Sequence, residues 1–346
     1  MMYIHDAALI SPQESFGDID LESLASSSDN KMLVKERAYP DIPPNILRRM
    51  GKAVRIGVGS ALPLLNKASW NPDGIVIGTA MGGMEDCIRF LNQIIEYDEG
   101  QLTPTNFVQS TSNAIAGQIG LLTRNKAYNI THVHRGQAFE NSLIDVMMLL
   151  RENSKAEYLV GGLDEISTYN YNIDFLAGCW KEEDCDNKEL YECRTPGTIA
   201  GEGSAMFRIN SNPQNAQAAI SDIIVFQARD PQQVQNRIRQ FMERNALITE
   251  PPDLFLSGEN GDIRNLGYYT AIENLLPGST GIARFKHMTG EYATATAAAV
   301  WISVQLMKAG LPQHMIKRPA QDPKPRQVMI YNNFRGLQHS AILLKA

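Results

Sequence analysis

The segment "NITHVHRGQAFENSLIDVMMLL" (129–150) decides the fold, because it joins a short strand to a strongly apolar helix through a tight turn. The turn falls near Gly136 and Gln137, and the helix is predicted over 137–152. Many enzymes place a nucleophile at such a junction, since the helix N-terminus stabilises an anion. Here the turn holds neither Cys nor Ser. Apolar side chains then recur at helical spacing, which predicts one buried face: Phe139, Leu143, Val146, Met147 and Leu150.

Short apolar strands and longer helices alternate on both sides of this segment. After a turn-rich break at 210–217 the alternation starts again, with Asp230 and Pro231 at good N-cap and N1 positions of a helix. This order predicts an α/β protein built from two related halves, 1–210 and 211–346, with buried sheets between helices. The strands are predicted at 73–83, 156–167, 201–210, 218–228, 252–262, 326–334 and 340–346, and further helices at 83–97, 110–123, 230–246, 267–275 and 293–309.

The composition and charge of the chain argue against nucleic-acid-binding, secreted and membrane proteins. The chain has 346 residues, of which 43% are hydrophobic and 20% charged, as in ordinary soluble domains. A net charge of −6 gives no reason to expect a nucleic-acid partner. The N-terminal stretch lacks the pattern of a signal peptide, and no apolar run reaches the length of a membrane span. We therefore expect a cytoplasmic protein that does not associate with membranes.

The cysteines give no sign of a metal site. Cys87 lies in a helical pattern, whereas Cys179, Cys185 and Cys193 share one polar segment. Zinc sites use closely spaced Cys pairs or a matching His, and that spacing is absent here. We expect reduced thiols, no bound metal and no cofactor.

Six segments, in this order, resemble the β-ketoacyl synthases of the thiolase fold, in their shorter ketosynthase-like branch. The resemblance extends over roughly residues 45 to 346, and it implies a thiolase-like fold with a layered α-β-α-β-α core. "GTIAGEGSAMFRI" is the most specific of the six. The segments are "RRMGKAVRIGVGSA" (48–61), "TPTNFVQSTSNAIAGQIG" (103–120), "YLVGGLDEIS" (158–167), "GTIAGEGSAMFRI" (197–209), "FKHMTGEYATATAAAVWISVQLM" (285–307) and "NNFRGLQHSAILL" (332–344).

Members of this family perform a decarboxylating Claisen condensation. A Cys thiolate at a helix N-terminus takes an acyl group from a carrier protein. Two His, or a His and an Asn, then stabilise the enolate that forms when the malonyl group loses carbon dioxide. Carried over to this chain, the nucleophile position falls on Gly136 or Gln137, and neither side chain can form a thioester.

The two other catalytic positions are also substituted. The first His position falls on Ser257 or Gly258 in "SGENGD", and the second falls on Glu291 in "KHMTGE", which keeps Lys286 and Gly290. The terminal Gly-rich motif becomes "NNFRGLQ", which retains Phe334 and Gly336 with Arg335 between them. Condensing activity is therefore not expected, although the resemblance is to acyltransferases.

The resemblance implies three alternative functions. In the first, the chain is a non-catalytic partner of an active ketosynthase, as are chain-length factors, in which Gln commonly replaces the Cys. The second is an acyltransferase or hydrolase that acts on carrier-bound thioesters through His134 or Ser257. The third is a homodimer that binds acyl groups or acyl carrier protein without reacting. Acyl carrier protein is a partner in each case.

The candidates for altered chemistry are His134, Gln137 and Glu291. His134 could pair with Glu291 as acid and base; alternatively, His132 and His134 share one face of a strand and pack at an interface. Arg135 and Glu140 are expected to be exposed or capping. A second group, predicted mainly to form a turn, is the "GENGD" loop (258–262), whose Glu259 and Asp262 could approach Glu291. The basic connector 316–327 is either a solvated linker or a docking patch for an acidic carrier protein.

Overall fold

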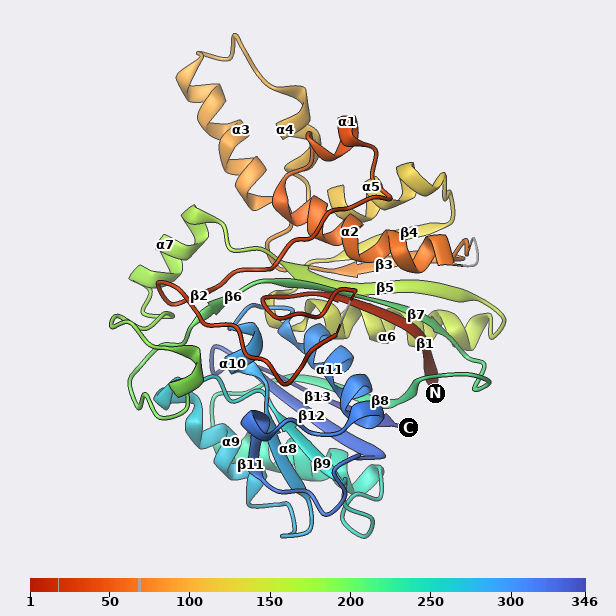
Figure 1. Ribbon diagram of the computed structural model, residues 1–346, viewed down its shortest axis with the longest axis vertical. Coiled ribbons are helices and arrows are strands. Elements are labelled where there is room, and N and C mark those ends of the chain that lie inside the picture. Colours follow the sequence, from red (N-terminus) through yellow and green to blue (C-terminus); the bar gives the residue numbers. More distant parts are fainter. Residues whose placement is uncertain (18, 68–69) are drawn as a thin grey trace.

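The computed structural model describes residues 1–17, 19–67 and 70–346 (Figure 1). The first half of the chain contributes one set of strands and helices. These are β1 (Met2–Ile10), β2 (Lys31–Met32), α1 (Pro44–Leu47), α2 (Lys52–Asn66), β3 (Gly74–Gly78), α3 (Met84–Glu96), α4 (Pro104–Gln109), α5 (Ala114–Thr123), β4 (Tyr128–His132), α6 (Ala138–Glu152), β5 (Glu157–Asp164), α7 (Thr168–Leu176), β6 (Ala200–Gly201) and β7 (Gly203–Asn210).

The second half repeats much of this order. Its elements are β8 (Ala218–Gln227), α8 (Pro231–Arg244), β9 (Leu254–Ser257), α9 (Leu266–Glu273), β10 (Gly281–Arg284), α10 (Lys286–Thr289), α11 (Ala295–Ala309), β11 (Ile316–Arg318), β12 (Gln327–Phe334) and β13 (Gln338–Lys345).

The strand order demonstrates the duplication. Strands β1-β7-β5-β3-β4 form one half of the sheet, and β8-β13-β12-β9-β10 form the other in the equivalent order. In each half three strands are parallel, and the remaining two run antiparallel to their neighbours. The two halves join where β1 pairs with β8. The predicted fold of two related α/β halves is therefore confirmed.

Helices and sheet halves alternate as five layers. Helices α6 and α11 lie in the centre, and the main core cluster joins them to strands of both halves. Helices α2 and α5 cover the outer face of the first sheet half, while α8 and α9 cover the outer face of the second (Figure 1). The division at residue 210 thus separates two sets of strands, but the central core belongs to both.

Local sequence explains several of these elements. The Asp230 side chain accepts a hydrogen bond from the Gln232 backbone N–H at 3.1 Å, with Pro231 opening α8, as the N-cap pattern predicts. The central helix α11 is rich in Ala and is buried from Ala295 to Val304, because it is packed between two sheet halves. The connector predicted at 316–327 begins as strand β11, which pairs with β10 at the sheet edge. No helix among the described residues is long and apolar enough to cross a membrane.

Candidate functional site

The turn between β4 and α6 has the form of a nucleophile elbow. A single turn of 3-10 helix, Arg135–Gln137, leads into α6. Arg135 has a φ of 49°, in the left-handed region that residues other than Gly seldom occupy. Strained backbone of this kind occurs at the turn that presents a nucleophile. The residue at the strained position is Arg135. It precedes Gly136 by one position and Gln137 by two, and these are the two residues at which the sequence predicts the nucleophile.

Gly136 leaves no room for a side chain. A Cβ atom built on it would lie 2.3 Å from the Phe334 Cβ and 2.5 Å from the Phe334 Cγ, far inside van der Waals contact. The Gly136 N–H donates to the Gln338 Oε1 at 3.0 Å. The turn is therefore closed against the hairpin of β12 and β13.

Gln137 is a structural side chain in this fold. It is buried, and its amide Nε2 donates to the backbone carbonyls of Phe226 at 2.9 Å and of His339 at 3.2 Å. These carbonyls belong to β8 and β13, so the amide ties the start of α6 to the second sheet half. Both protons of this amide are used within the protein.

Glu140 lies in the first turn of α6 but is neither exposed nor a cap, contrary to the expectation from sequence. Its carboxyl is fully buried and accepts a hydrogen bond from the Ser340 Oγ at 2.7 Å. Burial raises the pKa of this carboxyl above its ordinary value, because the charged form loses its hydration. The sequence could not reveal this burial, since the covering strand β13 lies about two hundred residues away.

The loop after β9 holds the positions Ser257 and Gly258. Ser257 is completely buried, and its Oγ accepts a hydrogen bond from the Glu259 backbone N–H at 3.2 Å. A Cβ on Gly258 would lie 2.4 Å from the Asn332 Oδ1, so this position also accepts no larger residue. Gly261 has a φ of 77°, which supports the interpretation of "GENGD" as a turn.

Glu291 is held by two partners in the cleft. Its Oε1 lies 2.6 Å from the Lys286 Nζ, and its Oε2 accepts a hydrogen bond from the Asn260 Nδ2 at 2.8 Å. Lys286 and Glu291 are both buried, so the two charges compensate each other away from solvent. Gly290 precedes Glu291 with a φ of 66°, and a Cβ there would lie 2.6 Å from the Ala200 carbonyl oxygen.

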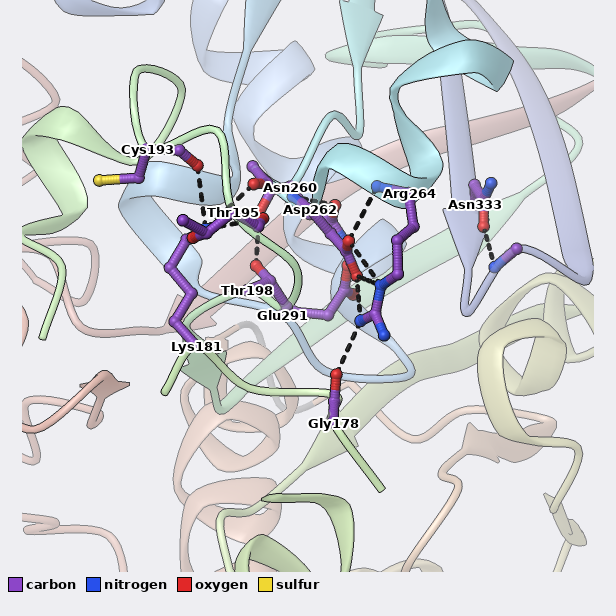
Figure 2. Close-up of polar contacts among 12 residues, drawn as sticks. Gly178, Lys181, Cys193, Thr195, Thr198, Asn260, Asp262, Arg264, Glu291 and Asn333 are labelled. Atoms are coloured by element: carbon purple, nitrogen blue, oxygen red, sulfur yellow. Dashed lines mark hydrogen bonds and ion pairs between the residues drawn. The ribbon is translucent and has the colours of Figure 1, made fainter. Parts of the chain in front are cut away.

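Figure 2 shows that further polar contacts frame this cleft. Arg264 forms an ion pair with Asp262, with 2.5 Å between Nη2 and Oδ2, and donates to the Gly178 carbonyl at 2.7 Å. The buried Lys181 Nζ donates to the carbonyls of Cys193 at 3.0 Å and Thr195 at 3.3 Å. The Arg264 contact joins the polar segment 178–195 to the region after β9, and the Lys181 contacts hold distant parts of that segment together.

The structure places the three candidates for altered chemistry apart. Glu291 lines a cavity of about 290 Å³, together with Cys179, Trp180 and Asn260. His134 is exposed and lines a different hollow of about 640 Å³, and Gln137 lines neither. Phe334 and Arg335 line both cavities. The arrangement does not bring His134 and Glu291 together as an acid–base pair.

The other acids near the cleft are neutralised by nearby cations. The Glu259 carboxylate lies 2.6 Å from the Lys317 Nζ and 3.4 Å from the Arg284 Nη1. Lys317 also contacts Glu273, so this cation of the basic connector faces the protein. Within the described ranges, no group of three or more His, Cys, Asp or Glu is arranged to hold a metal ion.

Burial opposes the ionisation of two of the four cysteines. All four are free thiols. Cys179 lines the Glu291 cavity, but burial raises the pKa of its thiol, and burial raises the pKa of Cys185 to about 12. Both groups are thus protonated thiols near neutral pH.

The structure adds Arg135 and Asn260 to the residues of this site. Arg135 carries the strained backbone, and Asn260 completes the hydrogen bonding of Glu291. In the sequence, only the position of this positive charge directly before Gly136 indicates that Arg135 belongs to the site. For Asn260 the signal was the predicted approach of the loop 258–262 to Glu291, in which Asn260 and not Glu259 or Asp262 makes the hydrogen bond.

Comparisons with known proteins agree with this geometry. Residues 24–173 match the family model described as the N-terminal domain of β-ketoacyl synthase. No curated protein matches the sequence closely enough to count as a relative. The structure is similar to a β-ketoacyl synthase from Burkholderia phymatum STM815, with a TM-score of 0.79 and 15% identity over 99% of this chain and 98% of that one.

Two other similar structures contain chain length factors. The ishigamide ketosynthase/chain length factor has a TM-score of 0.79 and 13% identity over 100% of this chain and 98% of that one. A ketosynthase in complex with its chain length factor from Xenorhabdus doucetiae has a TM-score of 0.76 and 14% identity, with the same coverage. At these identities the similarity establishes a shared fold. The chain therefore has the same thiolase-like fold as these ketosynthase structures, and its residues 24–173 match the N-terminal domain of β-ketoacyl synthase.

Proposed function

We propose that this protein is a non-catalytic partner of an active ketosynthase, in the manner of a chain-length factor, in a pathway of the fatty acid or polyketide type. In this role it completes a heterodimer that receives substrates from an acyl carrier protein. It does not condense acyl groups itself. The similarity to structures of ketosynthases with chain length factors agrees with this role.

The observation that carries the proposal is the closed elbow. Phe334 fills the space at Gly136, and the Gln137 amide is bound to two backbone carbonyls. The carboxylate of Glu291, which stands at the position of a catalytic His, is engaged by Lys286 and Asn260. Since a condensing site needs a free nucleophile and free hydrogen-bond donors, these arrangements favour a structural role.

An exposed apolar face supports a protein partner. Helices α3 and α4 project from the body of the molecule (Figure 1), and α3 buries only Asp86 among its thirteen residues. Large apolar patches on a protein surface commonly mark interaction sites. Strand β4 also belongs to the first half of the chain. It lies at the edge of the sheet, so one side of its backbone is unpaired. The exposed apolar side chains of this face are Leu91, Ile95, Tyr97, Leu102, Phe107 and Val108.

Co-purification tests the partner role. We expect the chain to form a stable complex with an active ketosynthase that keeps its Cys, measured by light scattering on a sizing column. The double substitution Ile95→Glu and Val108→Glu places charges on side chains that are 81% and 63% exposed, so it should abolish the complex and leave the fold intact. Ile248→Glu, at another exposed apolar position, is the matched control. A complex that survives the double substitution, or that never forms, contradicts the proposal.

Mass spectrometry tests the absence of catalysis. The isolated chain, incubated with acyl- and malonyl-carrier proteins, should gain no acyl group and should not cleave either thioester. Thioester turnover that disappears in His134→Ala or Ser257→Ala would instead support the acyltransferase or hydrolase alternative. Turnover that persists in both variants and co-elutes with the purified chain would also contradict the non-catalytic role, because another residue of the chain would then be responsible.

A further inference from the structure

The hollow at the elbow has an unusual charge for this protein. It encloses about 640 Å³ and is lined by four groups that are or can become cations. No Asp or Glu is among its described lining residues, although the whole chain has a net charge of −6. The four groups, which together we name the basic hollow, are His134, Arg135, Arg229 and Arg335.

Two of these guanidinium groups have no partner within the described protein. Arg335 forms an ion pair with Asp174, with 2.6 Å between Nη2 and Oδ2. Arg135 and Arg229 are exposed, and no ion pair or side-chain hydrogen bond engages either of them. Asp230 follows Arg229 in sequence, but its carboxylate caps α8. Unpaired cations in one concave site, without an opposing acid, create a local positive potential.

The backbone of Arg135 is strained. Its left-handed conformation costs about 1 kcal/mol or more for a residue with a side chain, and such strain is concentrated at functional sites. The conformation places Arg135 at the start of α6, where the helix dipole adds to the positive potential. The strained position of the elbow thus carries a cation.

The remaining lining adds an apolar surface. Val133, Phe334 and Leu337 line the same hollow as the cations. A phosphate monoester carries a charge of about −1.5 to −2 near neutral pH and three acceptor oxygens, so it matches two unpaired guanidinium groups better than a carboxylate with its single charge does. We propose that the basic hollow binds a phosphate monoester that bears a short apolar chain. The phosphate contacts Arg135 and Arg229, and the chain lies against the apolar side chains. This inference does not depend on the proposed partner role.

Calorimetric titration of the full chain tests this inference with three probes: hexyl phosphate, inorganic phosphate and hexanol. Hexyl phosphate should bind most tightly, inorganic phosphate more weakly, and hexanol not measurably. Raising the salt concentration should weaken the binding of hexyl phosphate, because its contacts are electrostatic. Hexanoate is the probe for the carboxylate alternative, and tighter binding of hexanoate than of hexyl phosphate would overturn the choice of phosphate.

Substitutions locate the site. Arg135→Gln and Arg229→Gln should each weaken hexyl phosphate binding by about ten-fold, as expected for loss of one charge-assisted contact. Arg124→Gln is a matched control, because Arg124 is also an exposed arginine with a left-handed φ of 55°. Arg229→Gln serves as the test if Arg135→Gln does not fold. Absence of binding to the unsubstituted chain, or equal affinity in Arg229→Gln and Arg124→Gln, overturns the proposal.

Discussion

Among single residues, the buried carboxyl of Glu165 affects the stability of the protein. Its side chain follows β5, and its Oε2 accepts a hydrogen bond from the Ala53 backbone N–H at 3.0 Å, whereas its Oε1 has no partner. Burial, together with the nearby charge of Asp86, raises the pKa of Glu165 to about 8. The carboxyl is therefore protonated in the folded protein at a pH where it ionises in the unfolded chain.

This difference makes stability depend on pH. A folded-state pKa above the unfolded value of 4.5 gives stability that is fully present below pH 4.5 and is lost as pH rises through about 8. Glu165→Gln keeps an acceptor for Ala53 and cannot ionise. We expect it to raise the free energy of unfolding by about 1–3 kcal/mol above pH 8, with a smaller gain toward pH 5.

Denaturant unfolding at several pH values measures the effect of Glu165→Gln. The exposed Glu182 provides the control, because Glu182→Gln removes the same charge without burial. Parallel pH profiles for Glu165→Gln and the unsubstituted chain would contradict this account of Glu165.

Two secondary-structure elements meet closely where the turn before α6 contacts the hairpin of β12 and β13. Phe334 ends β12, and its side chain lies where any Cβ on Gly136 would fall. Gly136→Ala should therefore force apart the two elements and lower the free energy of unfolding by about 1–3 kcal/mol. The same contact leaves no room for a Cys side chain at Gly136.

A double-mutant cycle measures this contact. In the Phe334→Ala background, Gly136→Ala should cost less, because the Phe334 Cγ and ring are gone, but a cost should persist, because the Phe334 Cβ remains. Gly278→Ala is the control, since a Cβ there meets no heavy atom within 4 Å. Additive costs of Gly136→Ala and Phe334→Ala would show that the elbow and the hairpin are not in tight contact.

For the whole molecule, the shared core predicts how the two halves fold. Phe139 of α6 and Ala297 of α11 both pack at Gly162 of β5, so the second half covers a strand of the first. Residues 1–210 expressed alone should lack a cooperative unfolding transition, because their central face would be exposed to water. Co-expression with residues 211–346 should restore it, since the break falls in an exposed turn after β7.

Circular dichroism and tryptophan fluorescence measure this behaviour. In the full chain the two signals should have the same unfolding midpoint, with Trp70 and Trp180 reporting on the first half and Trp301 on the second. A cooperative transition in isolated 1–210 would contradict the shared core and would show that the halves are independent domains.

Much of the fold followed from local patterns. The helical spacing at 137–152 corresponds to α6, and Asp230 with Pro231 marks the start of α8. These predictions succeeded because apolar periodicity and helix caps act between neighbouring residues. Edge strand β11 was missed, since three residues of a polar connector carry no period-2 pattern.

The sequence by itself determined that the turn before α6 holds neither Cys nor Ser. Its resemblance to the β-ketoacyl synthases predicts the nucleophile position at Gly136 or Gln137, and neither side chain can form a thioester. Only the tertiary structure decided what these positions do instead. It directs the Gln137 amide to carbonyls 89 and 202 positions away, buries Glu291 with Lys286, and leaves Arg135 exposed in a basic hollow. The physical reason is that burial and partners depend on how the two sheet halves pack around α6 and α11, and no local pattern encodes contacts of such long range.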